Sequence, residues 1–260
     1  MEKRFVFRGN AVGVAGHLHK PEDLIIGVQG ASSLPVIGGY AQSSIDRARF
    51  GDHLSFDTVL TRATGDYSPR EKAFKTLTNS VVKGLNVENR LTADAIESTF
   101  TSIYPENGGE PSIVPAGTHI TNLRIDGYRI IVTLDIDLFT KYATRESLAN
   151  AYATDDEFFR KYGKRFLTSD TQKPDPQKRE IPEVSGYIVC SIVSEVHTDH
   201  PRVIVDGNVL TLGGFGYIYL GELLITSVSR RLTLLRLKLG SPVEGEIACA
   251  EVESNGVIME

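Results

Sequence analysis

Apolar and polar residues alternate from residue 128 to residue 136, as expected for a β-strand that buries one face. Asp126-Gly127 stands immediately before this stretch. An Asp-Gly pair suits a two-residue turn in which both central residues take positive φ, so we predict a β-hairpin over residues 117–136. The turn sets a register with three facing pairs: Ile125 with Tyr128, Leu123 with Ile130, and Thr121 with Val132.

Strand-like runs bounded by glycine or proline fill residues 3–60 and return after residue 187. Residues 91–99 permit a helix as an alternative, but the density of Thr, Val and Ile around them favours a strand. The whole pattern predicts a mainly β protein, built as an antiparallel β-sandwich or a barrel-like domain.

Three further turns are expected in the C-terminal part of the chain. Asp206-Gly207 predicts a second hairpin. A polar turn is expected near residues 229–231, and Asn255-Gly256 predicts a turn within the C-terminal tail.

A small helical insertion is predicted at about residues 138–163. Thr144 can cap one short helix, and Thr154 with Glu157 three residues later fits a capping box for the next. Gly163 then ends the apolar stripe.

Residues 168–183 contain three prolines and almost no apolar side chains, which predicts an exposed, flexible connection. Because β-rich runs stand on both sides of the insertion, we expect one domain over residues 1–260, completed by both halves of the chain.

Composition removes several function classes. The net charge of −5 gives no reason to expect a nucleic-acid partner, because binding to phosphates needs clustered Lys and Arg. The two cysteines, Cys190 and Cys249, exclude a disulfide scaffold and are expected to be buried thiols, although a single bridge stays possible. No signal peptide or transmembrane segment is evident, so a cytoplasmic protein is the default expectation.

His17-x-His19 is followed by Glu22, and a second group of residues comes about ninety positions later: Gly109, Pro115, Gly117, His119 and Asn122. These residues resemble the two sequence motifs of cupins, which are metal-binding β-barrels. The resemblance covers only the two short stretches, and the numbers of residues between the matching positions differ from the cupin pattern. It implies that His17, His19, Glu22 and His119 would bind an iron, manganese or zinc ion. The alternative interpretation is a set of unrelated surface histidines.

A second histidine cluster, His197 to Pro201, is interpreted as a polar turn, because two ligands without a third do not make a metal site. Neither cysteine stands in a context that would activate a nucleophile, and there is no Gly-x-Ser-x-Gly motif. No catalytic residue is therefore assigned.

These observations favour a non-enzymatic protein that binds a ligand or assembles with copies of itself. Residues 217–228 and 232–239 are apolar on both faces, so each should be buried on both sides. The helical insertion or the N-terminal strands of the same chain could cover the second face, but because only two short helices are available, the pattern favours a second subunit and hence a homo-oligomer. The cupin-like metal-binding protein or metalloenzyme is the alternative. A third possibility, a β-rich toxin or pore-forming protein, rests only on the amphipathic hairpin from residue 216 to residue 239. The sequence indicates no ligand.

Overall fold

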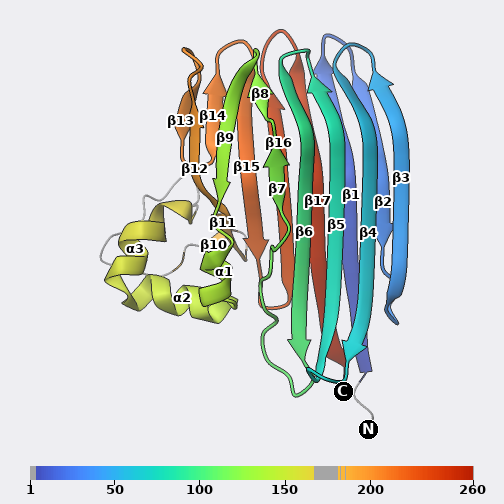
Figure 1. The fold of residues 1–260 in the computed structure, drawn as a ribbon, viewed down its shortest axis with the longest axis vertical. Coiled ribbons are helices and arrows are strands. Elements are labelled where there is room, and N and C mark those ends of the chain that lie inside the picture. Colours follow the sequence, from blue (N-terminus) through green and yellow to red (C-terminus); the bar gives the residue numbers. More distant parts are fainter. Residues whose placement is uncertain (1–3, 167–180, 182, 185, 260) are drawn as a thin grey trace.

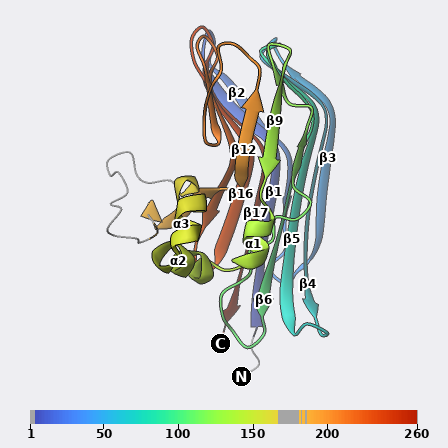
Figure 2. The ribbon, with the colours of Figure 1, turned by 60° about the vertical axis from the view of Figure 1, so that its left-hand side comes forward.

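The computed structural model describes residues 4–166, 181, 183–184 and 186–259. Two antiparallel sheets pack face to face, with long strands that run the height of the molecule (Figures 1 and 2). This confirms the predicted fold class, a mainly β sandwich with a small helical insertion.

The first sheet carries both ends of the chain, and we call it the terminal sheet. Its strands follow the order β10 (Glu183–Val184), β11 (Tyr187–Ser191), β15 (Gly216–Ile225), β16 (Ser229–Leu239), β17 (Glu244–Met259), β1 (Arg4–Lys20) and β2 (Leu24–Ser33). Two short strands join it beside β15: β14 (Val209–Leu212) and, outside that, β13 (Ile204–Asp206).

The second sheet comes mostly from the middle of the chain, and we call it the central sheet. Its order is β12 (Val193–Thr198), β9 (Tyr128–Leu134), β8 (Arg124–Ile125), β6 (Leu91–Pro105), β5 (Ala73–Val87), β4 (Leu54–Ser68) and β3 (Gly39–Phe50). β7 (His119–Thr121) pairs with β6. The strand assignment of residues 91–99 is thus confirmed.

The hairpin around Asp126-Gly127 is confirmed at its turn. Both residues have positive φ, and Ile125 pairs with Tyr128 as predicted. The pairing of Thr121 with Val132 is wrong, because Thr121 pairs with Ala95 in β6 instead. Asn122, with a φ of 56°, separates β7 from β8, so the chain leaves the hairpin register there.

The other predicted turns are displaced or missing. In the second hairpin Asp206 pairs with Val209, which makes Gly207 and Asn208 the central residues. The turn expected at 229–231 lies at 226–228, before β16 begins. Asn255 and Gly256 form no turn but continue β17 beside β1; a Cβ on Gly256 would lie 2.1 Å from the ring of Phe5, so this glycine permits close packing.

Glycines in residues 4–20 suggested several short strands, whereas β1 runs unbroken for 17 residues. Gly13 shows the reason, since a Cβ there would meet Cγ1 of Val59 in the opposite sheet at 2.1 Å. The glycine lets the two sheets approach closely and does not interrupt the strand.

Three short helices among the described residues form the predicted insertion: α1 (Asp137–Lys141), α2 (Arg145–Thr154) and α3 (Asp156–Tyr162), followed by the 3-10 helix η1 (Gly163–Arg165). Figure 1 shows them beside one edge of the sandwich. The predicted Thr144 cap is confirmed, with Ser147 completing the capping box. The Thr154 cap is wrong, because the Asp155 carboxylate accepts hydrogen bonds from the first amides of α3. None of the described helices is long and apolar enough to cross a membrane.

The connection predicted over 168–183 falls outside the described residues, apart from Ile181 and the backbone of Glu183.

The interior has an apolar part and a polar part. One large cluster of buried apolar side chains, from Ala11 to Val252, receives residues from both sheets and from the helices. Elsewhere small hydroxyl side chains lie between the sheets. Ser80 Oγ donates to the Val12 carbonyl oxygen at 2.8 Å, and Ser254 Oγ donates to the Thr76 carbonyl oxygen at 3.1 Å. Such bonds satisfy the buried polar groups and join the two sheets directly.

In each sheet, five neighbouring strands or strand ends contain a residue at which the alternation of inward and outward side chains shifts by one position. These residues lie next to one another and form a line across the sheet. The line comprises Gly221, Leu234, Ala250, Gly13 and Gly30 in the terminal sheet, and Arg47, Asp57, Gly84, Asp94 and Asn122 in the central sheet. Alternate members have positive φ, including Ala250 at 54° and Gly84 at 64°. A left-handed residue in mid-strand allows the following side chains to turn to the other face.

This exchange explains why some strands looked apolar on both faces. Leu234 and Leu235 are both completely buried within one chain, because the inward face changes between them. The pattern that suggested a covering subunit therefore has an intramolecular cause.

Candidate functional site

The most unusual surface feature is a run of 22 residues, 24–45, without a charged side chain, in a chain that is 23% charged. The run forms β2, the following loop and most of β3, and we call it the charge-free edge. It holds five exposed large apolar side chains: Ile25, Val28, Val36, Ile37 and Tyr40. Ile25 and Ile37 are the most exposed of them, at 71% and 73%.

β2 and β3 are also edge strands. Among the described residues β2 is hydrogen-bonded only to β1, and β3 only to β4. They lie together at one side of the sandwich, opposite the helices (Figure 1). An edge strand presents unpaired backbone N–H and C=O groups, and natural proteins usually protect such an edge with charges, proline or a bulge.

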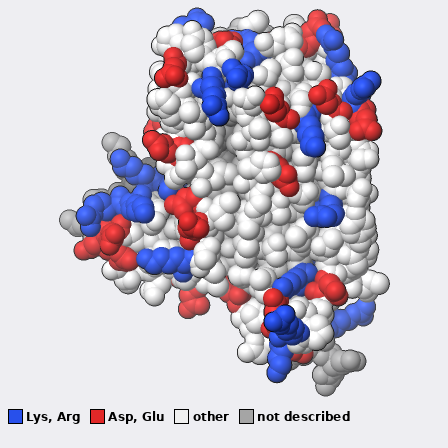
Figure 3. Space-filling model, in the orientation of Figure 1, with Lys and Arg blue, Asp and Glu red and all other residues white. Residues whose placement is uncertain are grey.

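In β2 the register with β1 shifts between Ile26 and Gln29, and Pro35 stands in the loop, whereas in β3 such protection begins only near the end of the strand. Asp46 is the first charged residue after Asp23, and Arg47 has a φ of 50°, so the strand departs from regular geometry there. Figure 3 shows charged side chains gathered near the upper and the lower ends of the central sheet and a sparsely charged surface between them. The first part of β3, residues 39–45, is thus open for pairing.

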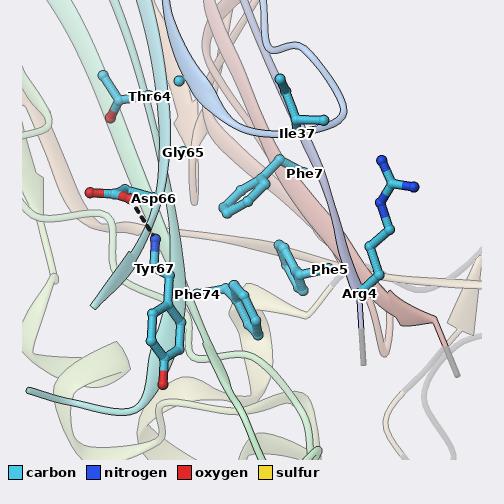
Figure 4. Close-up of a pocket in the computed structure, with 10 residues that line it drawn as sticks. Arg4, Phe5, Phe7, Ile37, Thr64, Gly65, Asp66, Tyr67 and Phe74 are labelled. Atoms are coloured by element: carbon cyan, nitrogen blue, oxygen red, sulfur yellow. Dashed lines mark hydrogen bonds between the residues drawn. The ribbon is translucent and has the colours of Figure 1, made fainter. Parts of the chain in front are cut away.

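An aromatic groove continues from this edge. It is an open cavity of about 1000 Å³, lined by Arg4, Phe5, Phe7, Ile37, Gly39, Thr64, Gly65, Asp66, Tyr67 and Phe74. In Figure 4 the rings of Phe5, Phe7 and Phe74 lie close to one another, with Ile37 beyond them. The rings of Phe5 and Phe74 stack with centroids 4.4 Å apart. Since Ile37 and Gly39 belong to the charge-free edge, groove and edge form one continuous surface, on which Arg4 and Asp66 are the charged side chains of the groove.

The predicted metal ligands are only partly brought together. His17 and His19 point outward from β1, with ring centroids 4.1 Å apart. Asp23, in the turn before β2, approaches them, and its Oδ1 lies 2.5 Å from His17 Nε2. Among the described residues these three are the one group whose metal-binding atoms all lie within 4.8 Å of one another.

Glu22 and His119 lie outside this group. Glu22 is an exposed residue of the turn. His119 belongs to β7 in the central sheet, where its Nε2 lies 3.8 Å from Glu97 Oε2. The four residues that the cupin resemblance implied are therefore not gathered around one point.

The second histidine cluster is more than the predicted polar turn. His200 is buried, and its Nε2 lies 3.4 Å from Oδ2 of Asp126 in the central hairpin. Arg90 donates two hydrogen bonds of 2.8 Å to the same carboxylate, and these hydrogen bonds lower the pKa of Asp126. The sequence did not reveal this network, because its members are 36 and 74 residues from Asp126.

Both cysteines are buried free thiols, as predicted, and no bridge joins them. Burial raises the pKa of each thiol to about 12. A thiol that stays protonated at neutral pH is a poor nucleophile, so neither cysteine is a candidate catalytic residue.

Comparison with known proteins adds a family but no activity. The family described as a domain of unknown function (DUF8256) matches residues 5–226, and the chain therefore belongs to this family. No curated protein and no solved structure matches the chain.

Proposed function

Since family membership names no activity, we propose from the structure that this is a non-enzymatic structural protein that assembles with copies of itself through the charge-free edge. One observation carries the proposal. The two neighbouring edge strands and the loop between them contain a run of 22 residues without a charge, and five large apolar side chains of this run are exposed. Edges of this kind pair readily with another strand, which supplies the missing hydrogen bonds.

A second copy of the chain is the occupant that the sequence of β3 fits best. In a symmetric antiparallel pairing centred on Gln42, residues 39–45 of one copy would face residues 45–39 of the other. All of these residues are uncharged. Asp46 and Arg47 would then face Gly38 and Ile37 of the second copy, so no like charges would oppose each other.

The aromatic groove supports the same interface. Because Ile37 lines the groove and belongs to the charge-free edge, a copy that paired along β3 would also cover part of the groove. Burial of exposed apolar side chains would add a hydrophobic contribution to the backbone hydrogen bonds. The pore-forming alternative gains no support, because the hairpin of β15 and β16 lies inside the terminal sheet with most of its side chains buried.

Analytical ultracentrifugation at micromolar concentration tests the proposal. The wild-type chain should sediment with a mass above that of one chain, 28.5 kDa. The double variant Gln42→Lys with Ser44→Lys adds two exposed charges to β3 and should sediment as single chains, since the lysines of two copies would oppose each other.

Thr133→Lys is the matched control, because Thr133 is exposed in β9 of the same sheet and far from β3 in the strand order. This variant should associate as the wild type does. A monomeric wild-type protein, or a β3 double variant that associates unchanged, would overturn the proposal.

A further inference from the structure

Two imidazoles and a carboxylate lie close together where β1 ends and the turn to β2 follows. His17 and His19 are two positions apart in β1 and therefore share its outer face, while Leu18 between them is buried. β1 is hydrogen-bonded to β17 on one side and β2 on the other, so the histidines stand on a supported strand. Asp23 comes from the turn itself.

We propose that His17, His19 and Asp23 bind one divalent transition-metal ion, for which zinc is the best match. Imidazole nitrogen and carboxylate oxygen are common zinc ligands, at about 2.0–2.2 Å from the metal. Ligand atoms in a tetrahedral site are then about 3.3–3.5 Å apart. The three ligand atoms here already lie within 4.8 Å of one another, so small side-chain rotations would complete the geometry.

The bound metal would replace the direct contact between His17 Nε2 and Asp23 Oδ1, which lie 2.5 Å apart. Both side chains are accessible, with 43% and 74% of their surfaces exposed, so each has room to rotate and a metal ion can reach them.

The charges around the turn are compatible with a cation. Lys20, the nearest lysine along the chain, is paired with Glu244 at 2.9 Å. Glu246 lies opposite His17 in the register between β1 and β17, on the same face of the sheet. Glu246 in turn faces Lys238 in the register between β16 and β17. These two pairs of opposite charges add no net charge beside the turn, so the negative charge of the proposed site comes from Asp23.

A cavity of about 410 Å³ adjoins this group. Its lining includes His19, Lys238, Glu244 and Glu246. Zinc with three protein ligands keeps a further position for water or another small ligand. The proposed ion would therefore lie at the border of a cavity that can admit such a ligand, with Lys238 available to contact an anionic one.

This site is independent of the proposed assembly and differs from the cupin-like set. It uses Asp23 in place of Glu22, and it does not include His119. The difference gives the experiment its matched controls.

Calorimetric titration of Zn²⁺ into the untagged, chelator-treated chain of 260 residues is the direct test. The wild type should bind one Zn²⁺ per chain. Asp23→Asn and His17→Ala should each weaken binding by at least about tenfold, since loss of even an indirect contact to a bound metal commonly costs that much. Titration with Co²⁺ should add a visible absorption band in the wild type that Asp23→Asn lacks.

Glu22→Gln removes the same charge from the neighbouring residue, and His119→Ala removes a histidine from the other sheet. Both should bind Zn²⁺ as the wild type does. Thermal unfolding in the presence of chelator would show that every variant is folded. Absence of saturable binding in the wild type, or binding that depends on Glu22 and His119 but not on Asp23, would overturn the proposal.

Discussion

Arg230 of β16 is completely buried, and its guanidinium donates a hydrogen bond to Oε1 of Glu110 at 3.2 Å. It also donates to the carbonyl oxygens of Pro111, Ser229 and Thr226. The second oxygen of Glu110 accepts a hydrogen bond of 2.9 Å from the Glu146 amide in the first turn of α2. Glu110 therefore connects the terminal sheet, the loop after β6 and the helical insertion. Burial lowers the pKa of Arg230, and the adjacent carboxylate opposes that shift.

Arg230→Met should destabilise the protein strongly. The substitution leaves the Glu110 carboxylate and several carbonyl groups without their buried partner, and breaking a buried ion pair costs about 3–5 kcal/mol. Urea unfolding would measure the loss. Arg231→Met is the adjacent control: its side chain is 45% exposed and pairs with Glu253 at 3.1 Å, so its loss should cost less than about 1 kcal/mol. Equal losses in the two variants would contradict this account.

Asp126→Asn should reduce stability in a pH-dependent way. Asparagine also tolerates positive φ, so the turn can be kept while the hydrogen-bonded ion pair with Arg90 is lost. At pH 7 we expect a loss of about 2 kcal/mol, typical of a hydrogen bond to a charged group.

The sign of the pH effect follows from the lowered pKa of Asp126 in the folded state. Its contribution is fully present above the ordinary carboxyl pKa of about 4 and is lost as the pH falls through the folded-state value. Urea unfolding at pH 7 and at steps below pH 4 should show the two proteins converging in acid. A constant difference across that range would be the contrary result.

Gly127→Val should destabilise the central hairpin through the backbone alone. Gly127 has a φ of 83°, and a Cβ placed there meets no atom within 4 Å, so steric contact with other residues plays no part. A non-glycine residue held in this region costs about 1–3 kcal/mol, and more when it is β-branched. Thermal unfolding would detect the change. Gly213→Val is the control, because Gly213 has equal free space without positive φ, and should be nearly neutral.

The two thiols should not react with a disulfide reagent at pH 8 while the protein is folded. Both are completely enclosed, and their raised pKa leaves almost no thiolate at that pH. Two equivalents should react after denaturation in guanidinium chloride. Rapid reaction of either thiol in the native protein would show that the interior opens readily.

Local chemistry made part of this structure predictable from the sequence. The Asp126-Gly127 turn, the Thr144 cap and the strand from residue 91 depend on neighbours in the chain, and all three are confirmed. The burial of the two cysteines followed from their isolation in the sequence and their apolar character. The uninterrupted uncharged run from 24 to 45 was also visible, although only the fold makes both of its strands edges.

Contacts between distant residues decided the rest. The sequence Asn255-Gly256 predicts a turn. In the structure both residues pair with β1, and the ring of Phe5 packs against Gly256, so they continue the strand. Arg230 reads as part of a polar turn, but Glu110, 120 residues away, makes its burial possible. The turn after β1 brings Asp23, and not Glu22, to His17. The pattern of apolar and polar residues predicts which side of a strand is buried. Which distant residue a buried side chain then contacts depends on how the two sheets pack, and neighbouring residues in the sequence carry no signal for that contact.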